Sequence, residues 1–298
     1  MPVEDVVSGA VYRISNKASG TWLDTLDGSP DDNTKVSGYS SDAGGKNFWN
    51  QLWVLKAIRN MDNRRSMHFT VTNVRSGTVL DLHDGSSANR TRIQGFHSEK
   101  DNRNQEWIIN EWNNTGYYVF ENVQGCTVMD LDDGSKDNGT PVQGYEQQNN
   151  NPNQLWKLSR VSRNATEVER TISSQVPARK AIYATDHIED RTYITLPSSP
   201  YNMWDDIWSR CGLKPNKWLW RAQIFDCEDF AIVAKSGVSQ WAYDNIRADN
   251  ISICFGIISC EIRDGHMHGM NWFLDNDANP QNFVFFEPQN RKTTSMVN

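Results

Sequence analysis

One segment pattern occurs three times before residue 160, and this repetition constrains the fold of the chain more than any other feature. Each copy contains an Asp-Gly pair and ends in a Gln-x-Trp motif. The three motifs are Gln51-Leu52-Trp53, Gln105-Glu106-Trp107 and Gln154-Leu155-Trp156. Stretches such as residues 69–74, with alternating apolar residues, lie between them and predict short β-strands. Since one copy cannot bury its apolar face alone, the pattern predicts three β-rich repeats that share one core.

Three Gln-x-Trp motifs in register, each with the same upstream signature, resemble the ricin B-chain lectin family. That resemblance implies a β-trefoil over residues 1–160, which we expect to form a first, all-β domain. It also implies that Trp53, Trp107 and Trp156 belong to the core and that the neighbouring Gln residues brace the fold.

Each repeat also carries residues suited to a sugar. An Asp precedes an aromatic residue by fifteen positions, and an Asn-Gln pair follows. A carboxylate can accept hydrogen bonds from two vicinal hydroxyls, an amide can donate and accept beside it, and an aromatic face can cover the C–H side of the ring. The family uses these positions for sugar, so the resemblance implies three candidate sites: Asp24, Tyr39, Asn50 and Gln51; Asp81, Phe96, Asn104 and Gln105; Asp130, Tyr145, Asn153 and Gln154.

The three repeats are not equally promising. The third has the full pattern, the second has Phe96 where Trp or Tyr is usual, and the first has a longer insertion before Gln51. A purely structural role for these residues stays open, most of all in the first repeat. Several weak sites on one rigid body would favour binding to glycoconjugates on membrane surfaces through avidity.

The overall composition excludes some classes of protein. The formal net charge is −7, so the chain lacks the basic balance typical of nucleic-acid binding, and no nucleic-acid partner is expected. No apolar run approaches the length of a membrane span, and the N-terminus lacks the pattern of a secretory signal. The five cysteines match no metal-ligand spacing and are expected to be mostly reduced, which fits a cytoplasmic protein.

Residues 161–298 follow a different pattern and are expected to form a second, α+β domain. Residues 164–175 and 200–212 predict two short helices, and the spacing of apolar residues from Asp229 onward predicts a third. Residues 251–262, 268–276 and 282–290 predict three strands that are antiparallel neighbours.

A cysteine at the start of the third helix suits nucleophilic catalysis. The helix dipole and the free N–H groups of its first turn favour the thiolate of Cys227 and can stabilise an oxyanion. His268 and Glu287 lie on the following strands, in the order expected for a base and the residue that orients it. Sequence alone does not show that the three converge.

The strings IFDCEDFAIVAK, HGMN and VFFEPQN resemble the C-terminal domain of fungal chimerolectins of the Marasmius oreades agglutinin and Polyporus squamosus lectin type. This resemblance implies a papain-like, calcium-dependent cysteine protease domain that also forms a homodimer, with Cys227 as nucleophile, His268 as base and Glu287 as orienting residue. Three departures stand out: Glu228 replaces Asp, Gly269-Met270 replaces Ala-Tyr, and a short polar end follows Asn290, which weakens the dimer expectation.

Carboxylates crowd the candidate nucleophile. Asp226, Glu228 and Asp229 would disfavour a thiolate at Cys227 unless a cation neutralised them. With the resemblance, this predicts a Ca²⁺ site, or one for another divalent ion such as Mn²⁺, whose ligands are Glu228, Asp229, Gln289 and Asn290. The alternative is that Asp226 caps the helix and Asp229 complements its dipole. A zinc site at His266 and His268 is disfavoured because no third clustered ligand is evident.

Two functions of different classes follow. The first is a glycan-binding lectin with a calcium-dependent papain-like cysteine protease domain, whose partners are galactose- or N-acetylgalactosamine-containing glycans and a peptide substrate. The alternative is a catalytically silent multivalent lectin whose C-terminal domain only dimerises. The Cys227, His268 and Glu287 set favours the first, because a scaffold does not need all three.

Overall fold

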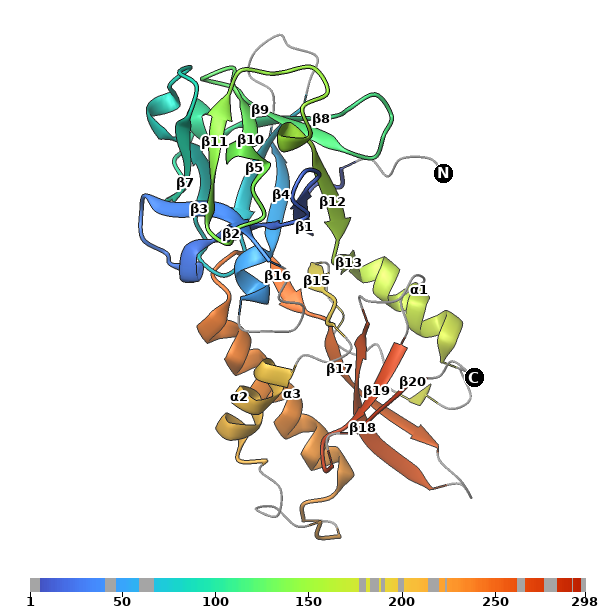
Figure 1. Cartoon of the computed structure of the whole chain (residues 1–298). Coiled ribbons are helices and arrows are strands. Elements are labelled where there is room, and N and C mark those ends of the chain that lie inside the picture. The colour runs from blue at the N-terminus through green and yellow to red at the C-terminus, as the bar shows by residue number, and fades with distance from the viewer. Residues whose placement is uncertain are drawn as a thin grey trace. The chain divides into compact units, whose positions relative to one another are not determined.

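The computed structural model divides the chain into two compact units (Figure 1). The trefoil unit comprises Met1–Asp42, Asn47–Arg160 and Ile246–Asp249, and the C-terminal unit comprises Ala43–Lys46, Val161–Asn245 and Asn250–Asn298. The structure describes residues 6–40, 47–58, 67–176, 181–182, 188, 191–197, 201–213, 220–222, 224–261, 266–275, 283–290 and 292–295.

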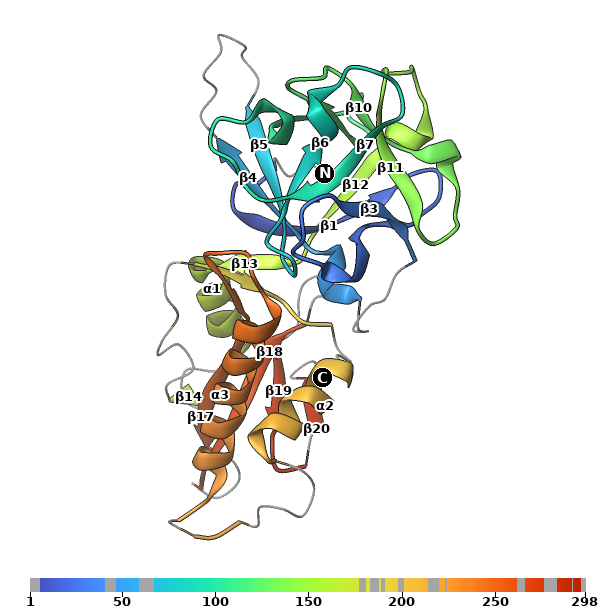
Figure 2. The same cartoon turned by 90° about the vertical axis from the view of Figure 1, so that its left-hand side faces the viewer.

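In the part of the chain that the structure describes, the trefoil unit contains twelve strands, four in each repeat. They are β1 (Ala10–Asn16), β2 (Trp22–Thr25), β3 (Thr34–Tyr39), β4 (Trp53–Ile58), β5 (His68–Asn73), β6 (Val79–Leu82), β7 (Thr91–Phe96), β8 (Trp107–Glu111), β9 (Tyr118–Asn122), β10 (Val128–Leu131), β11 (Thr140–Tyr145) and β12 (Trp156–Arg160). Strands β1, β4, β5, β8, β9 and β12 form a closed ring of antiparallel pairs. The hairpins β2–β3, β6–β7 and β10–β11 complete the unit, and β3, β7 and β11 pair with one another (Figure 2). The predicted β-trefoil is confirmed.

The Gln-x-Trp tryptophans form the centre of this unit, as predicted. The side chains of Trp53, Trp107 and Trp156 are 0% exposed. Each indole Nε1–H donates to a main-chain oxygen of the β2, β6 or β10 strand, at 2.9 Å in all three repeats. The tryptophan of each motif therefore joins its own strand (β4, β8 or β12) to the hairpin of the same repeat by a hydrogen bond.

The Asp-Gly pairs lie in single 3-10 turns after β2, β6 and β10. These turns are η1 (Leu26–Gly28), η3 (His83–Gly85) and η5 (Asp132–Gly134). Asp84 has φ 54° and Gly85 φ 59°, which is the left-handed pair of a tight turn. A Cβ on Gly85 would lie 2.3 Å from Oδ1 of Asn104. Glycine is thus required both by its backbone angle and by the close approach of a predicted sugar-site amide.

Among its described residues, the C-terminal unit contains three helices and two sheets. The helices are α1 (Ala165–Gln175), α2 (Tyr201–Cys211) and α3 (Cys227–Asn245). The three-stranded sheet contains β13 (Ser162–Asn164), β15 (Thr192–Ile194) and β16 (Ile251–Ile253); the five-stranded sheet contains β14 (Ala181–Ile182), β17 (Phe255–Glu261), β18 (Met267–Leu274), β19 (Phe283–Glu287) and β20 (Lys292–Ser295). The three predicted helices and the antiparallel order β17–β18–β19 are confirmed.

Helix α1 begins with a reciprocal capping box. The side chain of Asn164 accepts the N–H of Glu167, and the Glu167 carboxylate accepts the N–H of Asn164, both at 2.8 Å. Its buried residues Val168 and Ile172 pack in one core cluster with Trp272 of β18. Helix α3 packs against β18 and β17, and Figure 2 shows it running alongside them.

The prediction of one strand over residues 251–262 was wrong. The segment is divided: β16 pairs in parallel with β15, whereas β17 pairs with β14 and β18 in the other sheet. The change occurs at Cys254, which is 0% exposed and donates its N–H to the Ile194 carbonyl at 2.8 Å. Three consecutive buried residues, Ile253, Cys254 and Phe255, mark the place where the chain passes between sheets.

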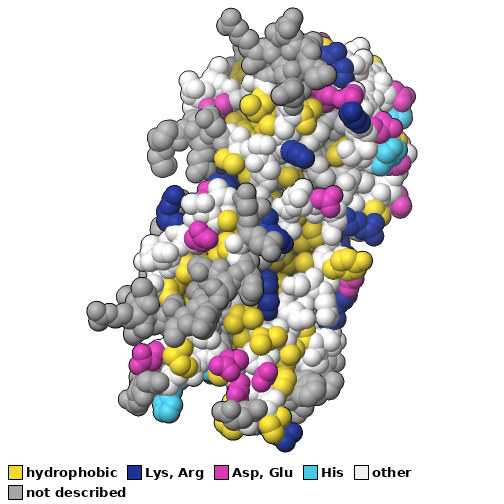
Figure 3. All heavy atoms as spheres, turned by 180° about the vertical axis from the view of Figure 1, so that it is seen from behind, with side chains coloured by type: hydrophobic (Ala, Val, Ile, Leu, Met, Phe, Trp, Pro, Cys, Tyr) yellow, Lys and Arg dark blue, Asp and Glu magenta, His cyan; other side chains and the backbone are white. Residues whose placement is uncertain are grey.

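Charged side chains lie interspersed over the described face drawn in Figure 3. None of the five cysteines, all of which the structure describes, forms a disulfide. Among the described residues, no helix is long and apolar enough to cross a membrane.

Candidate functional sites

The second-repeat site, defined as Asp81, Phe96, Asn104 and Gln105, surrounds a buried carboxylate. Asp81 is 4% exposed. Its Oδ1 accepts from Nε2 of Gln94 at 3.0 Å, and its Oδ2 accepts from Nε2 of Gln105 at 3.2 Å. Burial raises the pKa of Asp81, and the two hydrogen bonds oppose that rise. These two hydrogen bonds therefore fix the orientation of the Asp81 carboxylate, whose oxygens can each accept a further hydrogen bond from a ligand.

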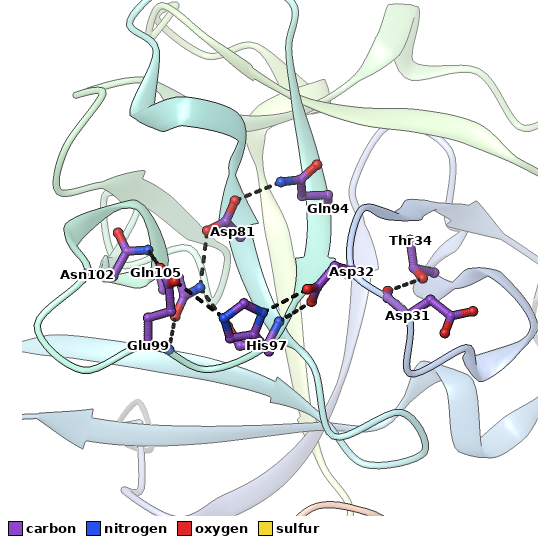
Figure 4. Close-up of polar contacts among 9 residues, drawn as sticks. All are labelled: Asp31, Asp32, Thr34, Asp81, Gln94, His97, Glu99, Asn102 and Gln105. Carbon is purple, nitrogen blue, oxygen red and sulfur yellow. Dashed lines mark hydrogen bonds and ion pairs between the residues drawn. The ribbon is translucent and has the colours of Figure 1, made fainter.

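A hollow of about 220 Å³ opens at this site. Three of the four predicted residues line it, namely Asp81, Phe96 and Asn104. Gln105 is buried, and its Nε2 donates to the Asp81 carboxylate (Figure 4). Glu99 and Asn102 line the hollow as well. The sequence did not indicate them, because they lie in the loop between Phe96 and Gln105, where the three repeats have little sequence in common.

The third repeat builds the same arrangement. Asp130 is buried, which raises its pKa, and its Oδ1 accepts from Nε2 of Gln143 at 3.2 Å. Nε2 of Gln154 donates to the Glu146 carbonyl at 3.0 Å. Tyr145 and Asn153 are partly exposed, as a sugar contact requires.

The first repeat departs from this arrangement. Ser37 lies opposite Asp24, in the register position of Gln94 and Gln143. Asn50 is only 5% exposed, and Oε1 of Gln51 accepts from Arg13 at 2.6 Å. Tyr39 is partly exposed. The first repeat thus keeps the predicted residue types but buries the amide that a sugar would contact.

In the C-terminal unit, α3 begins at Cys227, so that the thiol lies in the first helical turn. The N–H of Asp226 donates to Oδ2 of Asp229 at 3.1 Å, closing the start of the helix. Sγ of Cys227 accepts the main-chain N–H of Gly269 at 3.3 Å. A Cβ at position 269 would lie 2.9 Å from Cγ of Glu228, so glycine permits this close approach of β18 to α3.

His268 and Glu287 form a direct pair. Nε2 of His268 lies 2.5 Å from Oε2 of Glu287, and Oε1 of Glu287 accepts the N–H of Gln289 at 3.1 Å. The hydrogen bond to Glu287 raises the pKa of His268 despite partial burial of the ring. Since Nε2 is engaged by the carboxylate, Nδ1 is the ring nitrogen that remains for proton transfer.

The structure brings Cys227 next to the main chain of the His268 segment, but not into a hydrogen bond with the imidazole. Among the described residues no such bond joins Sγ to His268. Gly269 faces α3, while Met270 and Trp272 face the core that contains α1, so strand alternation places His268 on the latter face. Proton transfer between Cys227 and His268 therefore requires a rearrangement of this site, and catalytic hydrogen bonds are often unformed before substrate binds.

The predicted cation ligands lie at the start of α3 and after β19. Glu228, Gln289 and Asn290 are exposed, and Oδ1 of Asn290 accepts the N–H of Lys292 at 2.9 Å. Oδ1 of Asp226 is buried without a hydrogen-bond partner. Within the described part of the chain, no three His, Cys, Asp or Glu side chains are grouped closely enough to hold a metal. A cation here would therefore need amide or carbonyl ligands too.

Asn271 was missed from the sequence, although it belongs to the HGMN string. It is 0% exposed, and its Nδ2 donates to the carbonyls of Ala231 in α3 at 3.0 Å and Gly256 in β17 at 3.1 Å. A buried asparagine in an apolar strand was the available signal. Asn271 therefore joins α3 to β18, the strand that contains His268.

The family assignment follows from the comparisons with known proteins. A family model described as ricin-type β-trefoil lectin domain-like matches the overlapping residues 3–96, 49–145 and 103–176, more than half of the chain. The chain belongs to this family. A model described as agglutinin C-terminal matches residues 193–293, so the chain is a ricin B-type lectin with an agglutinin C-terminal domain, as predicted.

Two solved structures match nearly the full length. The Polyporus squamosus lectin bound to the human-type influenza-binding epitope Neu5Acα2-6Galβ1-4GlcNAc is 25% identical, with 97% of this chain and 95% of that chain covered and a TM-score of 0.78. The complex of PSL1a with E64 is also 25% identical, with 98% and 96% covered and a TM-score of 0.79. The search of curated proteins returned no match.

Proposed function

We propose that this lectin binds galactose- or N-acetylgalactosamine-containing glycans through its second and third repeats and cleaves peptide bonds with Cys227. The observation that carries the protease half is the His268–Glu287 pair, 2.5 Å apart, beside a helix-start thiol that accepts the Gly269 N–H.

The sugar chemistry rests on the buried carboxylates. Asp81 and Asp130 accept hydroxyl donors of a sugar, while Phe96 or Tyr145 covers its C–H face. Asn104 and Asn153 supply an amide beside them. The epitope in the Polyporus squamosus lectin structure contains galactose, in keeping with the sugar proposed for this chain.

A glycan array with Asp81→Asn, Asp130→Asn and the double variant tests this half. Each single change should weaken binding about 10- to 100-fold at its own site, the range for a lost hydrogen bond to a charged group, and the double variant should lose binding. Asp24→Asn is the matched control and should change little. An array on which the unaltered chain finds no glycan would refute the proposal.

The peptide chemistry follows the thiol-imidazole scheme. The Cys227 thiolate attacks the carbonyl carbon, and the resulting oxyanion is stabilised by free N–H groups at the start of α3. His268, protonated at Nδ1 after taking the thiol proton, gives that proton to the leaving amine, and the C–N bond breaks. Water, deprotonated by His268, then hydrolyses the thioester and regenerates the thiol. Glu287 stabilises the imidazolium throughout.

We further propose that a divalent cation, Ca²⁺ or Mn²⁺, controls this site. Glu228, Asp229, Gln289 and Asn290 would hold it, and the unpartnered buried oxygen of Asp226 supports an additional charge partner there. When bound, the cation supplies positive charge that offsets the carboxylates around the thiol. Carboxylate and amide oxygens are the ligands that Ca²⁺ prefers.

Melting curves with and without Ca²⁺ test this without any activity assay. A ligand at 100 times its Kd stabilises the folded state by about 2.7 kcal/mol, so the melting temperature should rise. Asp229→Asn should reduce that rise, whereas Asp205→Asn, on α2, should not. Equal melting temperatures with and without Ca²⁺ would refute the cation site.

Labelling identifies the nucleophile independently of substrate. Iodoacetamide should modify Cys227 faster than Cys211, whose pKa is raised by burial. E64, the ligand in the PSL1a complex, should bind the unaltered chain but not Cys227→Ala. A Cys227 that stays unlabelled with and without Ca²⁺ would contradict the proposal.

A further inference from the structure

Two side chains from different repeats meet beside the second-repeat site. Asp32 belongs to the loop between η1 and β3 in the first repeat, and His97 directly follows Phe96 in the second. The His97 N–H donates to Oδ1 of Asp32 at 2.7 Å, and the ring Nδ1 lies 2.8 Å from Oδ2 (Figure 4). One carboxylate thus holds both the main chain and the side chain of His97.

His97 also contacts three parts of the site itself. Its ring lies against the Phe96 ring, with centroids 4.5 Å apart and an interplanar angle of 32°. Its Nε2 lies 3.3 Å from Oε1 of Glu99. Its main-chain oxygen accepts from Nε2 of Gln105 at 2.9 Å. The aromatic platform, the loop and the buried amide therefore all depend on where His97 lies.

Glu99 continues this set of contacts. Its N–H donates to Oε1 of Gln105 at 2.9 Å, and its Oε2 accepts from Asn102 at 2.6 Å. The same Gln105 holds Asp81. A conformational constraint on His97 and Glu99 is thereby transmitted to the carboxylate that would bind sugar.

In the other two repeats a neutral asparagine accepts the equivalent main-chain N–H. Oδ1 of Asn89 accepts the N–H of Glu146, and Oδ1 of Asn138 accepts the N–H of Ser40, both at 2.7 Å. Each repeat thus supports the loop of the next through an equivalent residue. Only at the contact with the second repeat are the two residues an Asp and a His.

We propose that Asp32 and His97 are positioning residues for the second-repeat site, which binds glycan more tightly when His97 is protonated. The inference rests on glycan binding at that repeat. The imidazolium joins Asp32 to Glu99, so the loop is held in its binding conformation before the sugar arrives. The charged groups that face His97 are Asp32 from the first repeat and Glu99 from its own loop.

The direction of the pH effect follows from these contacts. The hydrogen bond to Asp32 raises the pKa of His97 above its ordinary 6.5 and lowers that of Asp32. The ion pairs of His97 with Asp32 and Glu99 are therefore fully formed below about pH 6.5. They are lost as the pH rises through the raised pKa of His97. Asp81 must be ionised to bind, so affinity should pass through a maximum between the pKa of Asp81 and that of His97. The third repeat should keep its affinity on the alkaline side.

The test isolates the second repeat in an Asp24→Asn, Asp130→Asn parent and measures the Kd for N-acetylgalactosamine by calorimetry from about pH 5.5 to 8.5. Affinity of the parent should fall about two- to fivefold with rising pH, the range of an exposed ion pair. Asp32→Asn keeps a side-chain oxygen that accepts the main-chain N–H of His97 but removes the negative charge. This variant should therefore bind the sugar weakly and without this pH dependence. His97→Gln should behave alike.

Asp31→Asn is the matched control. Asp31 is adjacent in sequence, but its carboxylate accepts from Ser29 and points away from His97 (Figure 4). It should retain the pH profile of the parent. NMR titration should also show a lower His97 pKa in Asp32→Asn.

Two failures are distinguishable. A parent that binds glycan with the same affinity across the range, or an Asp32→Asn variant with an unchanged profile, overturns the positioning role alone. A parent that binds no glycan at any pH overturns the proposed function of this repeat and the positioning role with it.

Discussion

The trefoil unit takes the predicted residues of each candidate sugar site from one short stretch of chain, whereas the C-terminal unit takes those of its candidate site from three separated segments. In the second repeat, Asp81 and Gln105 belong to one hairpin and the turn that follows it. In the C-terminal unit, Cys227, His268 and Glu287 come from α3, β18 and β19. The predicted sugar residues of a repeat therefore lie close together in sequence, although Asp32 and Asn33 of the first repeat also contact or line the second-repeat site. The C-terminal site instead depends on how a helix packs on a sheet.

The largest expected effect breaks the shared core of the repeats. Trp107→Ala removes a side chain that is 0% exposed and should lower the free energy of unfolding by about 3–5 kcal/mol. Trp220, which is 58% exposed in the C-terminal unit, supplies the control, because Trp220→Ala should change stability by no more than about 0.5 kcal/mol. Urea unfolding measures both. Equal losses would contradict the assignment of the Gln-x-Trp tryptophans as core.

A smaller effect is expected where α3 approaches β18. Gly269→Ala forces its Cβ against Glu228 and should destabilise the chain by about 1–3 kcal/mol while slowing alkylation of Cys227. Gly116→Ala is a suitable control for added volume, because a Cβ there meets nothing within 4 Å, although its positive φ of 75° adds strain. An unchanged rate of alkylation in Gly269→Ala would show that the Gly269–Cys227 contact does not affect the reactivity of the Cys227 thiol.

What the sequence could predict follows the same division. The three β-rich repeats with a shared core and the helix near Cys227 depend on repeats and local periodicity, which a sequence displays directly. The trefoil and its tryptophan core followed from the family resemblance. The break at Cys254, the role of Asn271 and the Asp32–His97 contact depend on segments that meet only after folding. Of the site residues named from the sequence, Asp81, Phe96 and Asn104 line one hollow and His268 pairs with Glu287. The face on which His268 lies was not predictable from spacing.

The smallest expected effect concerns pH. Glu287 raises the pKa of His268, so the pair stabilises the folded chain below about pH 6.5, and this contribution is lost as pH rises through the raised pKa. The difference in unfolding free energy between the unaltered chain and Glu287→Gln should therefore be largest near pH 5.5 and shrink toward pH 9. A difference that does not vary with pH would exclude a charged pair.

Peptide cleavage by matched cysteine variants tests the central claim most directly. The unaltered chain, Cys227→Ala and Cys211→Ala are incubated with a peptide library and Ca²⁺, and products are identified by mass spectrometry. Loss of the nucleophile should reduce cleavage by a factor of about 10³ or more, while Cys211→Ala should cleave as the unaltered chain does. Cleavage that survives in Cys227→Ala, or that the unaltered chain never shows, would contradict a thiol protease joined to this lectin.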